Sequence, residues 1–305
     1  MTTATNQFVV GQWVKVKSAA EILKTLDENG LTAGIPMMPE MLSLCGKSFR
    51  VRPANKTCVN SSTVYIGELS NVYILQTEAR CDGSGHGGCQ MGCNFYWHVD
   101  WLLPSEKPSA AQTIVEVDES AREHLLSLAG TGSPNCFRCQ ATELVNIATP
   151  SSPLKLKQYL RDLRAGVGPL AIAGFLGRLV YKKITRKSDS LVGQCKRTPS
   201  IDLNLQVGDR VQPKSVAAIQ KTLDRQGCNR GLWFDPDEMA PFCGKAMVVS
   251  RVVHQLIDEK TGELKTLQQP CIVLADTACS GVFRRFCSRG MLHFWREVWL
   301  ERLEA

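Results

Sequence analysis

The segment Lys17–Gly30 reads KSAAEILKTLDENG, and Lys214–Gly227 repeats it as KSVAAIQKTLDRQG. Nine of the fourteen positions are identical. A glycine and a strand-like run come before each segment, and a Cys-Gly-Lys triplet follows each one, beginning at Cys45 and at Cys243. Self-similarity of this kind indicates a module that is present twice in the chain.

The similarity continues along both copies, and from Cys45 and Cys243 onward the spacing stays at 198 residues. It aligns four further pairs: Cys81 with Cys279, Cys89 with Cys287, Trp97 with Trp295, and Trp101 with Trp299. We therefore divide the chain into a first module (1–104), a helical and basic connecting segment (105–204) and a second, divergent module (205–305).

The residue pattern within a copy predicts short strands around a small core. Four runs have the alternation or composition of strands: Val9–Lys17, Lys47–Arg52, Ser62–Ile66 and Val72–Gln76. Ser18 and Glu21 form a capping box that starts a short helix, and Gly30 is placed to end it. We expect a mainly β protein with some α (α+β), in which each copy is an SH3-like barrel.

Each module is also expected to end in a helix. Trp97 and Trp101 are four residues apart, which places them on one face of a helix that begins at Cys89. In the second copy, the run from Met291 to Leu300 reads as an amphipathic helix. In the connecting segment, Leu154–Arg164 is helical in pattern, and 167–183 is expected to form a second helix.

The thirteen cysteines decide which kind of chemistry to expect. The first residues lack the basic start and apolar run of a signal peptide, so we expect a cytoplasmic protein. Thiols stay reduced in that compartment, where clustered cysteines more often bind metal or do redox chemistry than form disulfides. The longest apolar stretch, 167–180, is too short to span a membrane.

The first copy contains the cluster CDGSGHGGCQMGC, which runs from Cys81 through Cys89 to Cys93 and includes His86. Thiolates are soft ligands that hold zinc or iron–sulfur clusters. The five glycines of this stretch let the backbone turn its N–H groups toward sulfur, which favours an iron–sulfur cluster over zinc. Buried cysteines without a metal are the alternative.

Three thiolates leave one ligand to be found. Cys139 is the first choice, with His86, Cys58 and Cys45 as the other candidates. The second copy keeps Cys243, Cys279 and Cys287 but has Met291 in place of the third clustered cysteine. A degenerate structural copy is therefore favoured there over a second metal site completed by Cys271.

Other chemistries have no signature in the sequence. We find no Ser/His/Asp motif, phosphate loop or dinucleotide fingerprint. The excess positive charge lies within 155–187, which has nine basic residues and one acid. Basic charge beside apolar residues suits an anionic membrane surface or an acidic partner, and helices packed on the modules are the alternative. Nucleic acid is not favoured, because no set of stacking aromatic residues accompanies the charge.

Three stretches carry a resemblance to an uncharacterised bacterial family of cysteine-rich proteins with tandem SH3-like modules. They are the cluster at Cys81–Cys93, the sequence CQATE at Cys139, and CSRGMLHFWREVWL from Cys287 to Leu300. Genes of this family often lie beside genes for polysaccharide or secondary-metabolite biosynthesis. The resemblance implies a biosynthetic setting without a reaction.

Two hypotheses follow for function. In the first, the chain is an enzyme or redox partner whose iron–sulfur cluster or zinc is held by Cys81, Cys89, Cys93 and Cys139. In the second, it is a non-catalytic interaction protein with a structural metal. A nucleic-acid-binding barrel is a third option, and it rests only on the expected fold and the basic segment.

Overall fold

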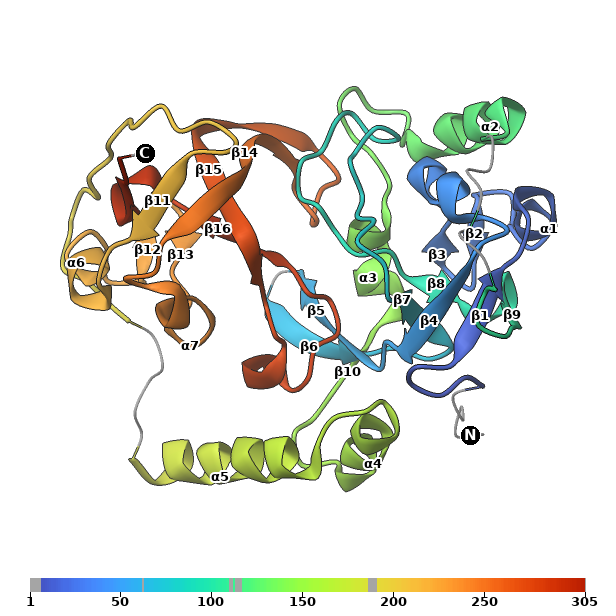
Figure 1. Ribbon diagram of the computed structural model, residues 1–305, viewed down its shortest axis with the longest axis horizontal. Coiled ribbons are helices and arrows are strands. Elements are labelled where there is room, and N and C mark those ends of the chain that lie inside the picture. The colour runs from blue at the N-terminus through green and yellow to red at the C-terminus, as the bar shows by residue number, and fades with distance from the viewer. Residues whose placement is uncertain (1–6, 62, 110–111, 113–116, 186–190, 305) are drawn as a thin grey trace.

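The computed structural model describes residues 7–61, 63–109, 112, 117–185 and 191–304. Helices and strands are mixed along the chain, and two five-stranded antiparallel sheets lie at opposite sides of the molecule (Figure 1). The first sheet has the order β8-β7-β4-β1-β9 and contains β1 (Trp13–Val16), β4 (Ser48–Pro53), β7 (Val72–Leu75), β8 (Trp97–His98) and β9 (Leu102–Pro104). The second has the order β16-β15-β14-β11-β17 and contains β11 (Arg210–Pro213), β14 (Met247–Ile257), β15 (Leu264–Ala278), β16 (Leu292–Trp295) and β17 (Leu300–Arg302).

The two sheets repeat one topology, as the duplicated sequence requires. In each, the first strand pairs with the second strand and also with the last one. Two fully buried tryptophans lie at the centre of each core, Trp97 and Trp101 in one and Trp295 and Trp299 in the other. None of the sheets formed by the described residues closes into a barrel, so the SH3-like barrel stays a prediction.

The short helix of each module is capped as the sequence predicts. Ser18 accepts the backbone N–H of Glu21, and Glu21 accepts the backbone N–H of Ser18 in return. The helix is shorter than expected, because α1 spans only Ala19–Leu23 and Gly30 does not end it. Asp27 accepts the N–H groups of Asn29 and Leu31, and this local turn competes with a longer helix. In the second module, α6 (Val216–Gln220) is its counterpart.

The C-terminal helix predicted for each module is wrong. The residues from Cys89 to Tyr96 form no helix, and Trp97 and Trp101 belong to β8 and to a 3-10 turn (Val99–Trp101) that leads into β9. The second module repeats this arrangement with the 3-10 turn Glu297–Trp299. A strand followed by one tight turn also buries two tryptophans four residues apart, so their spacing did not distinguish it from a helix.

Smaller elements complete the modules. The predicted strand at 62–66 corresponds to β6 (Val64–Glu68), and Ser62 lies outside the described residues. β6 pairs with β5 (Lys56–Asn60) and with β10 (Thr149–Pro150) in a three-stranded sheet. In the first module, a hairpin of β2 (Leu31–Thr32) and β3 (Ile35–Pro36) is followed by the 3-10 helix η1 (Pro39–Leu44). In the second module, a hairpin of β12 (Cys228–Asn229) and β13 (Leu232–Trp233) is followed by α7 (Pro236–Met239) and η3 (Ala240–Phe242). One more 3-10 helix, η4 (Val282–Arg284), precedes β16.

The described residues of the connecting segment form four helices: α2 (Glu119–Ala129), α3 (Gln140–Ile147), α4 (Leu156–Arg164) and α5 (Pro169–Thr185). The last two confirm the helices expected at 154–164 and 167–183. In the described part of the chain, every helix is too short or too polar to pass through a bilayer. α4 and α5 run along one edge of the molecule, below both large sheets in the view of Figure 1.

Candidate metal centre

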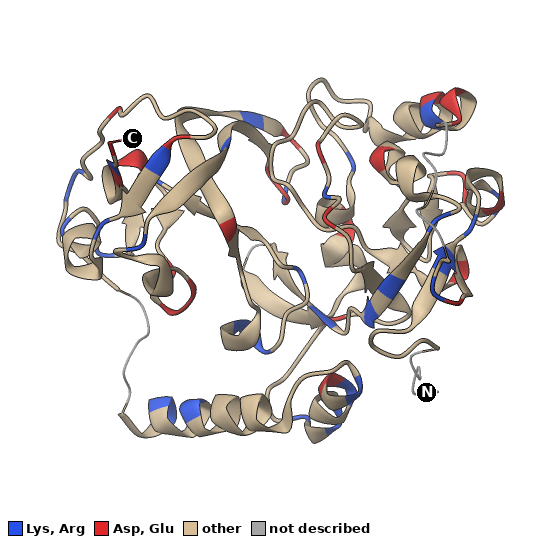
Figure 2. Ribbon diagram, in the orientation of Figure 1, with Lys and Arg blue, Asp and Glu red and all other residues tan. Residues whose placement is uncertain are grey.

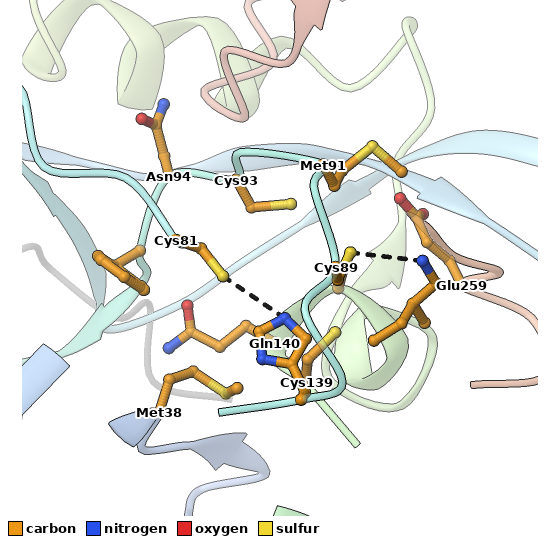
Figure 3. A pocket seen from close by; sticks show the side chains of 13 residues that line it. Met38, Cys81, Cys89, Met91, Cys93, Asn94, Cys139, Gln140 and Glu259 are labelled. Atoms are coloured by element: carbon orange, nitrogen blue, oxygen red, sulfur yellow. Dashed lines mark hydrogen bonds between the residues drawn. The ribbon is translucent and has the colours of Figure 1, made fainter. Parts of the chain in front are cut away.

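The predicted ligands come from two places in the chain and line one cavity. Three of the cysteines and His86 lie on the loop between β7, which ends at Leu75, and β8, which begins at Trp97. Cys139 lies directly before α3. Figure 3 shows the sulfur atoms of the four cysteines turned toward a common space, and the cavity is lined by Cys81, His86, Cys89, Cys93 and Cys139 among others. All thirteen cysteines of the chain are free.

The cluster loop is folded tightly upon itself. The N–H of Cys81 donates to the carbonyl of Cys93 at 2.9 Å, which joins the two ends of the cluster. Gly83 has a φ of +79°, and a Cβ added to it would lie 2.1 Å from the carbonyl oxygen of Cys89. Glycine is therefore required at this position, both for its backbone conformation and for the close approach of the chain.

The helix N-terminus in this site belongs to Cys139, not to Cys89 as predicted. Cys139 is the N-cap of α3, and its sulfur accepts hydrogen bonds from the N–H groups of Thr142 and Ala141. Gln140, the next residue, bonds both the N–H and the carbonyl of Tyr96 at 2.8 Å. These contacts hold the start of α3 against the end of the cluster loop.

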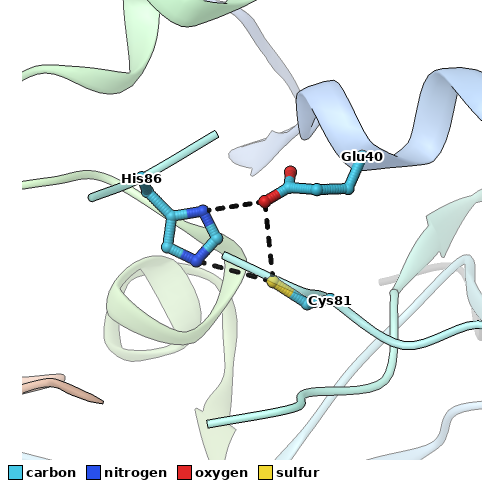
Figure 4. Close-up of side chains that lie close together, drawn as sticks. All are labelled: Glu40, Cys81 and His86. Carbon is cyan, nitrogen blue, oxygen red and sulfur yellow. Dashed lines mark hydrogen bonds and ion pairs between the residues drawn. The ribbon is translucent and has the colours of Figure 1, made fainter. Parts of the chain in front are cut away.

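His86 is buried between an acid and two sulfurs. Its Nε2 lies 3.5 Å from Cys81 Sγ, and its Nδ1 lies 3.2 Å from Oε1 of Glu40 (Figure 4). Burial alone would lower the pKa of His86, but hydrogen bonds to Cys81, Cys89 and Glu40 outweigh it and raise this pKa strongly. The Nε2 of His86 is therefore placed to form a hydrogen bond with the sulfur of Cys81.

Glu40, on the 3-10 helix η1, was not predicted as part of the site. It also accepts the N–H of Gly85 at 3.0 Å, which ties the cluster loop to η1. The duplicated sequence contained a signal that could have identified Glu40. Glu40 aligns with Glu238 at the same spacing of 198 residues, and Glu238 contacts the loop of the second module by accepting the N–H of Ser280.

The second module closes the cavity. Cys89 Sγ accepts the N–H of Ile257, at the end of β14, at 3.3 Å. Burial raises the pKa of Cys89, but hydrogen bonds from His86 and from the N–H groups of Met91 and Ile257 leave it below its usual value. Glu259, just beyond Ile257, also lines the cavity. The site therefore needs both modules and the connecting segment.

The other three thiols stay neutral when no cation is present. Burial is the main reason that the pKa values of Cys81, Cys93 and Cys139 are raised, for Cys93 to about 12. A bound metal removes such protons, because thiolates are the ligand form of cysteine. Of the four thiols, Cys89 therefore loses its proton most readily to an incoming cation.

The spacing of the sulfurs separates a single ion from a larger group. In the described residues, Glu40, Cys81 and His86 are the only three potential ligands whose donor atoms all lie within 4.8 Å of one another. Four thiolates around one zinc would lie about 3.8 Å apart, as a tetrahedron with bonds of about 2.3 Å requires. No three of the four sulfurs meet that condition. In a cubic iron–sulfur cluster each sulfur binds a different iron, so the sulfurs are further apart.

The free space between these side chains is about 30 Å³. That is room for one or two water molecules, which excludes an organic cofactor.

The remaining candidate cysteines lie elsewhere. Cys45 is buried in the first core beneath η1, and Cys243 occupies the matching place in the second module. Cys271 is buried beside Arg296. Cys58 lies in a different cavity, together with Cys279 and Cys287. The cavity therefore gathers the Cys81 cluster and Cys139 but not Cys45 or Cys58.

Comparisons with known proteins add no relative from which a function can be inferred. No protein-family model matches the sequence, and no curated protein or solved structure matches it either.

Proposed function

We propose that this chain is an iron–sulfur protein whose cluster is held by Cys81, Cys89, Cys93 and Cys139. One observation carries the proposal: four free cysteines from two separate segments turn their sulfurs into one cavity. No three of the four sulfurs lie within 4.8 Å of one another, and this spacing supports a cluster over one zinc ion held by the four thiolates alone.

Hydrogen bonds to the cysteine sulfurs also support an iron–sulfur cluster, because such bonds adjust its reduction potential. Cys89 accepts the N–H groups of Ile257 and Met91, and Cys139 accepts those of Ala141 and Thr142. His86 is assigned as a hydrogen-bond donor rather than a ligand, because Glu40 orients it and its Nε2 faces the sulfur of Cys81.

An iron–sulfur cluster supplies one-electron transfer. We therefore propose a redox partner or a redox enzyme, and the biosynthetic setting implied by the resemblance is its expected context. We also propose that each five-stranded sheet is an open SH3-like unit. The pairing of its first strand with its last, directly after a 3-10 turn, supports this, because such pairing curls a sheet toward closure.

The experiment is purification of the full chain without oxygen, followed by absorption spectroscopy and by iron, sulfide and zinc analysis. We expect sulfur-to-iron absorption bands with matching amounts of iron and sulfide. Cys89→Ser should lose most of the iron, because its sulfur is a ligand at the centre of the cluster loop. Cys195→Ser and Cys228→Ser are matched controls, since neither thiol lines the cavity, and both should keep the full amount.

Two results would overturn the proposal. Colourless protein with one equivalent of zinc would favour the interaction protein with a structural metal. Equal iron content in all three variants would show that the ligands are assigned wrongly.

A second candidate function, attachment to an anionic membrane, is favoured by the surface of α4 and α5. Most of the apolar side chains of α4 are not buried: Tyr159 packs inward, but Leu156 is 74% exposed. On α5, Leu170 and Ile184 are also exposed. Basic residues colour parts of the same two helices in Figure 2, and the exposed ones on or beside them include Lys155, Lys157, Arg164 and Lys183.

Part of the predicted basic segment serves the fold instead. Arg161 pairs with Glu68, and Arg178 pairs with Asp237 of the second module, so these two charges anchor the helices. Arg186 and Lys187 lie outside the described residues. The exposed charges that remain would each contribute about 1 kcal/mol near an anionic surface.

Co-sedimentation with vesicles of phosphatidylcholine and phosphatidylglycerol tests this candidate. We expect binding at low salt that is lost at high salt, because screening weakens surface attraction within a Debye length. The double variant Leu156→Ser, Leu170→Ser should lose binding. Val64→Ser is the matched control, because Val64 is as exposed as Leu156 but lies on β6. No binding at low salt would exclude this function.

A further inference from the structure

A second cavity lies where the second module repeats the cluster loop. Its volume is about 220 Å³, and it is more open than the first. Cys279 and Cys287 line it, as the counterparts of Cys81 and Cys89. Its third cysteine, Cys58, belongs to β5 of the first module. This cavity is therefore also built by both modules.

The two modules exchange equivalent contacts. Cys89 of the first module accepts the N–H of Ile257 of the second, and Cys287 of the second accepts the N–H of Cys58 of the first, at 3.1 Å. The residue after each of these cysteines also donates its N–H to a strand of the other module. The N–H of Gln90 donates to Gln255 in β14, and the N–H of Ser288 donates to Lys56 in β5. Each cysteine loop thus docks on a strand of the other module.

The second cavity differs from the first in its ligands. Met291 stands where the first module has Cys93, and Arg284 stands where it has His86. Arg284 points to Asp235 and lies over the ring of Trp233. Among the described residues, no three potential ligands of this cavity lie within 4.8 Å of one another. These differences argue against a second metal centre and leave a group of thiols with another role.

Cys58 and Cys287 are direct neighbours with unequal thiols. The backbone N–H of Cys58 donates to the sulfur of Cys287 at 3.1 Å, and both cysteines line this cavity. The hydrogen bond from the Cys58 side chain is the main reason that the pKa of Cys287 is lowered to about 7, while that bond and burial raise the pKa of Cys58. A thiolate beside a protonated thiol is the arrangement that thiol–disulfide exchange uses.

The cavity around this pair has features that suit a small polar ligand. Arg289 lines it, donates to the carbonyl of Cys58 at 3.0 Å, and forms a buried ion pair with Glu259. His293 also lines it, and its buried Nε2 has no hydrogen-bond partner among the described residues. A ligand in the cavity would supply that partner, because buried polar atoms are nearly always hydrogen-bonded.

We propose that Cys58 and Cys287 form a redox-active dithiol that exchanges with small-molecule disulfides in this cavity. The Cys287 thiolate attacks one sulfur of the external disulfide, forms a mixed disulfide and releases one thiolate. The Cys58 thiol then attacks the Cys287 sulfur, closes the intramolecular disulfide and releases the second thiolate. The Cys58 proton passes to one released thiolate, and the other released thiolate leaves as such or takes a proton from solvent, so the protein dithiol is oxidised by two electrons and the small disulfide is reduced to two thiol-level products.

The test is to equilibrate the reduced full chain, without oxygen, in glutathione buffers of increasing oxidised fraction. Free thiols are then alkylated, and the protein is digested with trypsin for mass spectrometry. Trypsin places the two cysteines in separate peptides: peptide 57–80 contains Cys58 as its only cysteine, and peptide 286–289 contains only Cys287. We expect the two alkylated peptides to be lost together and one cross-linked peptide to replace them.

Variants separate the two roles. Cys58→Ser should trap glutathione on peptide 286–289, because no second thiol can release it, and Cys287→Ser should remove both products. Cys279→Ser is the matched control, since it changes the same cavity but should leave the cross-link intact. The proposal is wrong if Cys58 and Cys287 stay alkylated in wild-type protein under conditions that modify Cys195, or if the cross-link joins Cys279. The wild-type result decides even if a variant fails to fold.

Discussion

Replacing Gly83 by alanine tests how the cluster loop is built. Gly83 has a φ of +79°, and the new Cβ would lie 2.1 Å from the carbonyl oxygen and 2.4 Å from the nitrogen of Cys89. Both atoms belong to the backbone, so no side-chain rotation relieves the clash. The loop must open at the point where Cys89 is positioned for binding.

A control variant separates the loss of stability into two parts, the cost of the left-handed backbone conformation and the cost of the clash. Gly46 has a φ of +75° with open space around it, so Gly46→Ala should lose only the left-handed preference, about 1–2 kcal/mol. Gly83→Ala should lose the same amount and the clash in addition. We expect its free energy of unfolding to fall by about 3 kcal/mol or more, within the range of substitutions at special backbone positions.

The assay combines urea unfolding of metal-free protein, followed by tryptophan fluorescence, with iron analysis of protein purified without oxygen. Gly83→Ala should lose iron, whereas Gly46→Ala should keep it. Gly281→Ala adds the same clash in the second module, 2.0 Å from the carbonyl of Cys287, so it should lose stability but keep iron. The reasoning is refuted if Gly83→Ala and Gly46→Ala agree within about 0.5 kcal/mol, or if both keep full iron.

Three further outcomes can be checked. His86→Gln should keep the iron and shift the midpoint of a potentiometric titration, since it removes the imidazole that contacts the sulfur of Cys81; loss of the iron would make His86 a ligand. Asp162→Asn should lower the free energy of unfolding by about 3–5 kcal/mol, because it leaves Lys56 buried without its partner, whereas replacing both residues by leucine and methionine should lower it far less in urea titrations. Burial lowers the pKa of His98 in the folded protein. The unfolded chain therefore takes up a proton first as the pH falls below about 6.5, and stability should drop toward pH 5 by up to about 1.4 kcal/mol per pH unit. His98→Gln should lose less over the same range, and a parallel fall of both proteins in urea titrations would contradict this.

Much of the site could be predicted from sequence because its ligands are close together in the chain. The spacing of Cys81, Cys89 and Cys93 predicted one cluster, and the choice of Cys139 as the fourth ligand stays a prediction that its place in the cavity supports. The role of Glu40 was missed because an isolated acid has no spacing signal of its own.

The parts that failed depend on tertiary structure. The helix expected after Cys89 rested on the period between Trp97 and Trp101. Both indoles are instead fixed by the core, and Trp101 donates to the hydroxyl of Thr25, as Trp299 does to Thr222. The neighbourhood of Cys58 and Cys287 joins residues 229 positions apart, and no local pattern predicts such a contact.

The contacts that the two modules exchange affect how the sequences of the two cysteine cavities can diverge. An isologous dimer of one module would make the Cys89–Ile257 type of contact twice, related by a twofold axis, and every substitution would change both sites at once. In a single chain the two contacts are encoded separately. One site can keep its four cysteines while the other replaces Cys93 by Met291 and takes a thiol from its neighbour instead. Covalent tandem linkage thus turns a symmetric pair of pockets into two pockets that are free to specialise.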